Sequence, residues 1–155
     1  MVLAFGLRES SSTALQLYGA DHGPHLEAVG VVTALEALIT KKDEKEGLTY
    51  RLGMRAANLL GRDADERKNI FRQVKQFYDL RSRIVHGDEI DDKLTKRLDE
   101  LETMRELLRR TLLSVMALVS NGKKRSDIAD LIDESAFDEE RRREVQGMAS
   151  GFLHM

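Results

Sequence analysis

FYDLRSRIVHG, residues 77–87, is the carboxyl-terminal end of a predicted amphipathic helix. Apolar side chains recur in and before it mostly at steps of three and four, the spacing of one helical face: Ile70, Phe71, Val74, Phe77, Tyr78, Ile84 and Val85. Gly87 follows at once, and glycine is the residue at which helices commonly stop in a left-handed turn. The pattern predicts a helix that starts at the acid-rich segment 63–66 and ends within about two residues of His86.

Two polar residues of this stretch, Arg81 and His86, are candidates for chemistry. His86 is expected in the last helical turn, where the helix dipole favours a positive imidazolium at the edge of the core. Arg81 lies earlier on the helix, about 140° around the axis and about 7.5 Å along it. The two side chains therefore do not stack on each other. Each can still reach into one shared cleft, above all when a second copy of the helix faces the first.

Arg81, four intervening residues, His86 and Gly87 form a motif that resembles the signature of the HEPN superfamily, and the run 78–87 is similar to its Apea-like branch in particular. Two upstream segments fit that branch at about the right distances: ALEAL at 34–38 and LTYRLGMRAANLLG at 48–61. The resemblance extends over roughly residues 30–120. It implies an all-α fold, an antiparallel helical bundle that pairs as a homodimer, with two sets of Arg81 and His86 facing one cleft.

The same resemblance implies metal-independent cleavage of RNA, with Arg81 and His86 as catalytic residues and no metal or cofactor. One His86 would take the proton from a ribose 2′-hydroxyl, whose oxygen attacks the neighbouring phosphate, while Arg81 stabilises the added negative charge. Such domains resemble bacterial toxins and anti-phage effectors and often follow another domain, so a regulatory partner or a fused domain is expected as well. The alternative is a non-catalytic dimeric interaction or regulatory module, in which both residues only tie their helix to its neighbours.

Three further residues are expected to support the site. Ser82 follows Arg81 directly and can add a hydrogen bond to a phosphate. Tyr78 is expected in the core, with its hydroxyl at a rim. Glu36 lies beside the apolar stripe of its own helix, and it is either an exposed acid or a carboxylate that holds an arginine of the motif.

Three arginines are candidate RNA-binding residues. Arg83 either contacts phosphate or is solvated. Arg51 and Arg55 lie four residues apart, and they either contact phosphate or pair with acids of a neighbouring helix, which is the commoner arrangement. The mixed charges of segment 41–47 predict a solvated loop. The arginine run at 141–143 is a surface helix, a flexible tail or an RNA-facing patch.

Composition bounds the class of protein. With 155 residues and 41% hydrophobic content, the chain is long and apolar enough for one globular domain. A net charge of −2 gives no global field for nucleic acid, so an RNA site would have to be a local basic patch. The absence of cysteine excludes disulfides, thiolate zinc sites and a cysteine nucleophile. No apolar run could span a bilayer and no signal peptide is recognisable, so we expect a cytoplasmic protein without membrane contact.

The remaining segments complete an expected bundle of four to five main helices with short terminal ones. Helices are predicted over 24–40, 48–60 and 91–120, with a first helix within 2–19 and a short one capped by Ser126. The segment 91–120 carries a heptad-like seam at Leu94, Leu98, Leu101, Arg105, Leu108, Leu112, Val115 and Val119. We expect a single domain over 1–155, with its core at about 24–120 and peripheral segments at 1–23 and 136–155.

Overall fold

The computed structural model describes residues 23–44, 46–87 and 92–153. Within these residues the fold is all-α, without a β-strand, as predicted. The described helices are α2 (Gly23–Ile39), α3 (Leu48–Leu60), α4 (Ala64–His86), α5 (Asp92–Leu98), α6 (Leu101–Ser120), α7 (Ile128–Ser135) and α8 (Glu139–Ala149), with short 3-10 turns at Arg125–Asp127 and Ser150–Phe152. The helix expected within 2–19 lies outside the described residues.

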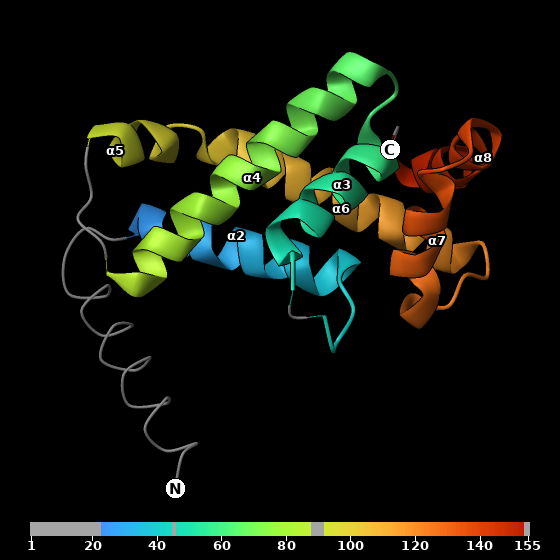
Figure 1. Cartoon of the computed structure of the whole chain (residues 1–155), viewed down its shortest axis with the longest axis horizontal. Helices are drawn as coiled ribbons and strands as arrows, with labels where there is room; N and C mark the ends of the chain where they lie inside the picture. The colour runs from blue at the N-terminus through green and yellow to red at the C-terminus, as the bar shows by residue number, and fades with distance from the viewer. Residues whose placement is uncertain (1–22, 45, 88–91, 154–155) are drawn as a thin grey trace, which may run out of the picture.

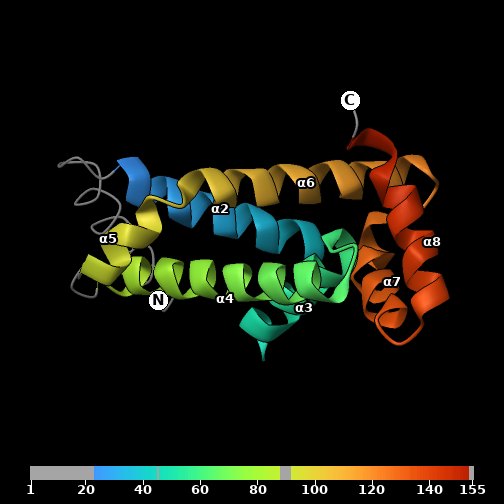
Figure 2. The same cartoon turned by 90° about the horizontal axis from the view of Figure 1, so that it is seen from above.

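Three long helices define the bundle. α2 packs between α4 and α6, and α4 runs in the opposite direction to the other two (Figures 1 and 2). α3 lies against α4, while α7 and α8 close one end of the bundle and α5 lies at the other (Figure 2). The chain thus forms one antiparallel bundle, with α4 and its terminal His86 on the outside.

One continuous core joins these helices. α2 contributes Val32, Leu35 and Ile39, and α4 contributes the predicted stripe that includes Val74, Phe77 and Ile84. α3 and α4 approach closely because residue 53 is glycine: a Cβ there would lie 2.8 Å from a ring carbon of Phe71. The periodicity around residues 70–85 therefore identified most of the buried face of α4, but it missed the fully buried Leu80 and included Val85, which is 42% exposed.

The helix predicted over 91–120 is wrong in two respects. The chain turns at residues 99–100, which separates α5 from α6. The apolar repeat continues in register through that turn, so the spacing could not reveal it. The buried face of α6 is also rotated from the expected seam, because α2 and α8 cover a different side of the helix. It consists of Leu101, Met104, Leu107, Thr111, Ser114, Val115, Ala117 and Leu118, whereas Leu112 and Val119 are 42% and 45% exposed.

The carboxyl-terminal helices are less peripheral than predicted. Val145 and Ala149 of α8 are buried in the same core as α2, α4 and α6, because α8 packs across the end of α6. Ser126 does not cap α7 as expected, since its hydroxyl contacts the Asp127 carboxylate at 2.6 Å. In the part of the chain that the structure describes, no helix is both long and apolar enough to cross a membrane.

Candidate functional site

The carboxyl end of α4 presents His86 at the surface. Gly87 adopts a left-handed conformation, with φ 72° and ψ 27°, and its N–H donates to the carbonyls of Arg83 and Ile84. An L side chain is strained in that conformation, so the glycine is what stops the helix immediately after His86. The predicted end of α4 is therefore confirmed, and the imidazole is exposed in the last turn.

Arg81 is held differently from His86. Its side chain is half-buried, and its guanidinium carbon lies 5.8 Å from the centre of the Tyr78 ring, a cation–π arrangement. Its Nε is buried and has no hydrogen-bond partner within the described structure. Arg81 therefore retains hydrogen-bonding capacity, although one side of the group rests on an aromatic ring.

Tyr78 connects Arg81 to Glu36. Burial raises the pKa of Tyr78, and so does the negative charge of the nearby Glu36 carboxylate, whereas the positive charge of Arg81 lowers it. The structure thus brings Glu36 to the motif through Tyr78. No ion pair between Glu36 and Arg81 occurs among the described residues.

Ser82 faces a groove on the other side of the motif. This open groove, of about 410 Å³, is lined by α3, α4 and α5 and includes Arg72, Lys75, Tyr78, Ser82 and Arg97. Arg97 donates to the Gln76 carbonyl at 3.1 Å and to the Asp79 carboxylate at 3.2 Å, which closes one edge of the groove. Arg83 lies 3.6 Å from the same carboxylate.

Within one chain, Arg81 and His86 are not brought together by any contact between described residues. Arg81 rests on the Tyr78 ring, whereas His86 is exposed at the end of the helix. This separation agrees with the 140° offset expected from the helical geometry. In one chain the two groups therefore lie on different sides of α4. A site in which an arginine and a histidine lie side by side needs one of the two from a second copy of the chain.

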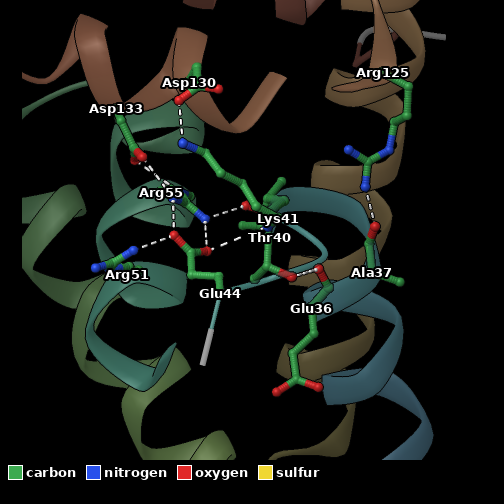
Figure 3. A network of polar contacts seen from close by, with 11 residues as sticks. Glu36, Ala37, Thr40, Lys41, Glu44, Arg51, Arg55, Arg125, Asp130 and Asp133 are labelled. Atoms are coloured by element: carbon green, nitrogen blue, oxygen red, sulfur yellow. Dashed lines mark hydrogen bonds and ion pairs between the residues drawn. The ribbon is translucent and has the colours of Figure 1, made fainter. Parts of the chain in front are cut away.

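Arg55 and Arg51 belong to an ion-pair network instead of a free surface (Figure 3). Arg55 is 1% exposed, and its nitrogens bond Glu44 at 2.5 and 2.8 Å, Asp133 at 2.6 and 2.8 Å, and the Ile39 carbonyl at 3.1 Å. Arg51 bonds the same Glu44 at 2.6 Å. Of the two interpretations left open for these arginines, pairing with acids is the one observed, and a guanidinium so buried has no surface for a phosphate.

The solvated loop expected at 41–47 is confirmed for its described residues with one exception, Glu44. The side chain of Glu44 is only 3% exposed, and its hydrogen bond to Arg55, assisted by Arg51, lowers its pKa to about 2. Burial lowers the pKa of Arg55, but the two carboxylates outweigh that effect and raise it. No local signal could have identified Glu44, because the fold alone brings Arg55 to Glu44 and Asp133 to the same guanidinium.

The arginines at 141–143 lie on α8, so the helical interpretation of that segment holds. Arg141 pairs with Glu134 at 2.6 Å, Arg142 with Glu139, and Arg143 with Glu139 at 3.5 Å. These charges are therefore compensated within the chain. The cations that sequence reasoning missed are Arg72 and Lys75, which line the groove beside Ser82.

No family model matches this chain, and neither a curated protein nor a solved structure matches it. The class that the fold defines is an all-α helical bundle. The function of the α4 terminus is therefore argued from its own residues and from the resemblance of the motif.

Proposed function

We propose that the protein is a metal-independent endoribonuclease of the HEPN type, which acts as a homodimer with Arg81 and His86 as catalytic residues. The observation that carries this proposal is the arrangement at the end of α4. An exposed histidine lies there directly before the left-handed Gly87, and five residues earlier the half-buried Arg81 has a buried Nε without a partner among the described residues. An exposed imidazole suits proton transfer near neutral pH, and a guanidinium suits a phosphate.

The reaction is an in-line transfer within RNA. The imidazole of His86 from one protomer accepts the proton of a ribose 2′-hydroxyl, and the 2′-oxygen forms a bond to the adjacent phosphorus. The bond from phosphorus to the 5′-oxygen breaks, and His86 of the other protomer protonates that oxygen. The products are a 2′,3′-cyclic phosphate and a free 5′-hydroxyl. Arg81 stabilises the extra negative charge on the phosphate oxygens in the transition state.

Neighbouring residues hold Arg81 in place for this role. The Tyr78 ring supports one face of the guanidinium. Tyr78 is itself partly buried and lies near the Glu36 carboxylate. Tyr78 and Glu36 are therefore positioning residues, which act through Arg81. Ser82, in the groove on the neighbouring face, donates to a phosphate next to the one that is cleaved.

Uncontrolled RNA cleavage harms the cell that contains it. The proposed activity therefore fits a cytoplasmic bacterial toxin or anti-phage effector, whose activity is held off by a regulatory partner or a fused domain.

The second candidate function is a dimeric interaction module without catalysis. It is favoured by the contact of Arg81 with Tyr78, since an arginine packed on a ring and linked to an acid through that ring needs no substrate. In that case Arg81 stabilises the junction between α2 and α4, and His86 caps a helix end.

One paired experiment separates the two functions. Wild type, Arg81→Ala and His86→Ala are assayed on a mixed RNA pool with EDTA present, and the thermal unfolding of each protein is measured. The nuclease requires wild-type cleavage that each substitution reduces by a factor of about 10² or more, with dimer and fold retained. A single 2′-deoxy position at the cut should block cleavage there. Wild-type inactivity on every RNA, together with destabilised variants, would leave only the interaction module.

A further inference from the structure

Ion pairing is unevenly distributed over the cationic residues of this protein. Arginines elsewhere in the described chain have carboxylate partners, for example Arg62 with Glu66 at 3.0 Å, Arg109 with Glu106 at 2.7 Å, and Arg141 with Glu134 at 2.6 Å. Arg72 and Lys75 on α4 are exposed, and neither has a carboxylate partner in the described part of the chain. The outer face of α4 therefore carries positive charge that residues 23–44, 46–87 and 92–153 do not neutralise.

These two cations lie on one stripe that ends at His86. Along α4, Lys68, Arg72, Lys75, Asp79, Ser82 and His86 follow one another at steps of four, three, four, three and four. Such steps keep side chains on one helical face, and the stripe from Lys68 to His86 is about 27 Å long. All six side chains are exposed or half-buried. The stripe is therefore a solvent-facing line that leads to the proposed catalytic histidine.

Two hollows adjoin this stripe and share Arg72. One is the groove beside Ser82, and the other, of about 630 Å³, lies between α3 and α4. The second has an apolar floor that includes Met54 and Phe71, and a cationic rim that includes Lys68 and Arg72. α4 and α3 lie side by side on the same face of the molecule (Figure 1). An apolar surface next to cationic side chains suits a ligand that has both flat apolar groups and anionic groups.

An aromatic ring stands beside the second hollow. Tyr50 of α3 is 62% exposed, and its ring meets the Phe71 ring edge to face, with centroids 5.6 Å apart and planes at 75°. A large exposed ring held rigid by a second ring is a platform on which a nucleobase can stack. Asp79, which belongs to the stripe, is compensated by Arg97 at 3.2 Å, and Asp65 is compensated by Lys68 at 3.6 Å, which leaves Arg72 and Lys75 as the cations of the stripe without a partner among the described residues.

We infer that the outer face of α4, together with Tyr50 of α3, binds single-stranded RNA and leads it to His86. This inference rests on the proposed function, because it gives the nuclease site its substrate path. Phosphates lie along Arg72 and Lys75, and an unpaired base stacks on Tyr50. A duplex offers no free base face to the ring, and an acidic peptide would match the cations but not the stacking platform.

The test measures RNA binding apart from cleavage. All proteins carry His86→Ala, so that a fluorescent single-stranded RNA of mixed sequence remains intact, and anisotropy is recorded over a range of salt concentrations. The double variant Arg72→Glu/Lys75→Glu is compared with Lys123→Glu/Lys124→Glu, which changes the net charge equally in the turn after α6. We expect the α4 variant to bind about tenfold or more weakly than the control. The slope of log affinity against log salt should also become shallower by about 1.4, since each lost phosphate contact contributes about 0.7.

A second set of variants tests base stacking on Tyr50 without changing the charge of the protein. Tyr50→Ala should weaken binding about fivefold or more with an unchanged salt slope, whereas Tyr50→Phe should bind like its parent. Double-stranded RNA should compete poorly. Circular dichroism and thermal unfolding verify the fold of each variant. If the glutamate pair does not fold, Arg72→Gln/Lys75→Gln replaces it, with a smaller loss and the same change of slope.

Three results would overturn the inference: equal losses for both charge variants, no effect of Tyr50→Ala, or no RNA binding at low ionic strength. Its failure and that of the proposed function are distinguishable. If the wild type cleaves RNA but its RNA binding does not depend on Arg72, Lys75 and Tyr50, only the proposed RNA-binding face is refuted. RNA binding that depends on these residues in a protein that never cleaves RNA would refute only the nuclease.

Discussion

At the scale of single residues, Arg55 is the most constrained charge in the described structure. A guanidinium that is 1% exposed has lost its hydration, and only well-placed acceptors can compensate for that loss. Glu44 and Asp133 supply those acceptors from a loop and from α7. A buried ion pair need not stabilise a fold more than apolar residues would. Removing one partner, however, leaves the other charge uncompensated.

We therefore predict that Arg55→Met lowers the free energy of unfolding by about 3–5 kcal/mol, because Glu44 would be left buried without its main partner. Arg51→Met is the matched control, since Arg51 bonds the same carboxylate but its side chain is 50% exposed. Its loss should be at most about 1 kcal/mol. Urea denaturation of both variants measures the difference. Equal losses would mean that burial of Arg55 does not determine its importance.

Glu44 gives a second prediction, in the dependence of stability on pH. Its pKa is about 2 in the folded protein, below its ordinary value of 4.5, because it is hydrogen-bonded to Arg55 and Arg51. The stability it contributes is therefore complete above pH 4.5 and is lost as the pH falls from there towards 2. Wild type should exceed Glu44→Gln in free energy of unfolding by a constant amount above about pH 5 and by a shrinking amount below it.

The difference between wild type and Glu44→Gln is measured by urea denaturation at a series of pH values from 7 down to about 2. In an Arg55→Met background the same comparison should lose most of its pH dependence, because the main cause of the lowered pKa is gone. A gap between Glu44→Gln and wild type that stays constant down to pH 2 would show that Glu44 is not held ionised by its partners.

At the scale of elements, α4 is bounded by local chemistry at both ends. The Asp63 side chain accepts the N–H of Glu66 at 2.8 Å, and Gly87 turns the chain in a left-handed conformation. The helix also carries acids in its first turn and Arg83 and His86 in its last, which suits the helix dipole. Position and length of α4, and thus the exposure of His86, depend on these two boundary residues.

The same substitution at two glycines should have opposite effects. Gly87→Ala should lower the free energy of unfolding by about 1–2 kcal/mol, because alanine is strained at a φ of 72°. Gly147→Ala, within α8 with open space around the new methyl group, should raise it by about 0.5–1 kcal/mol. Denaturation of both variants tests the pair. Stabilisation by Gly87→Ala would contradict the role of this residue as the stop of α4.

At the scale of the whole molecule, two exposed apolar surfaces are available for the self-association that the proposed mechanism requires. One surrounds the end of α4, where Val85 is 42% exposed beside His86. The other is the apolar side of α6, where Leu112, Met116 and Val119 are 42–49% exposed. The proposed mechanism requires the first, because the two His86 rings must reach one cleft.

Because the chain has no cysteine, a single introduced cysteine can report which of the two surfaces meets its copy. Under oxidising conditions Val85→Cys should form an intermolecular disulfide, because a dimer across the ends of α4 brings the two copies of residue 85 close together. Met116→Cys is the matched control on α6 and should remain largely monomeric in non-reducing gels. Sedimentation should show a dimer for the wild type at tens of micromolar. Cross-linking through residue 116 alone would contradict a shared His86 cleft.

The sequence by itself determined the features that rest on neighbouring residues. The all-α class, the buried stripe of α4 and the end of that helix at His86 follow from periodicity, an acid at the start and a glycine at the stop. Those signals act over a few residues, so no knowledge of distant segments was needed to read them. The motif of Arg81 and His86 was visible for the same reason.

Only the tertiary structure decided which surfaces are covered. The burial of α6 depends on α2 and α8, so an apolar repeat could not show that Leu112 and Val119 face outward. Arg55 gains its second carboxylate partner only when the chain brings Asp133 to it, 78 positions away. Arg72 and Lys75 likewise count as unpaired cations only because the described part of the fold places no acid against them. Pairing between distant residues is a property of the packed chain, and no local pattern carries it.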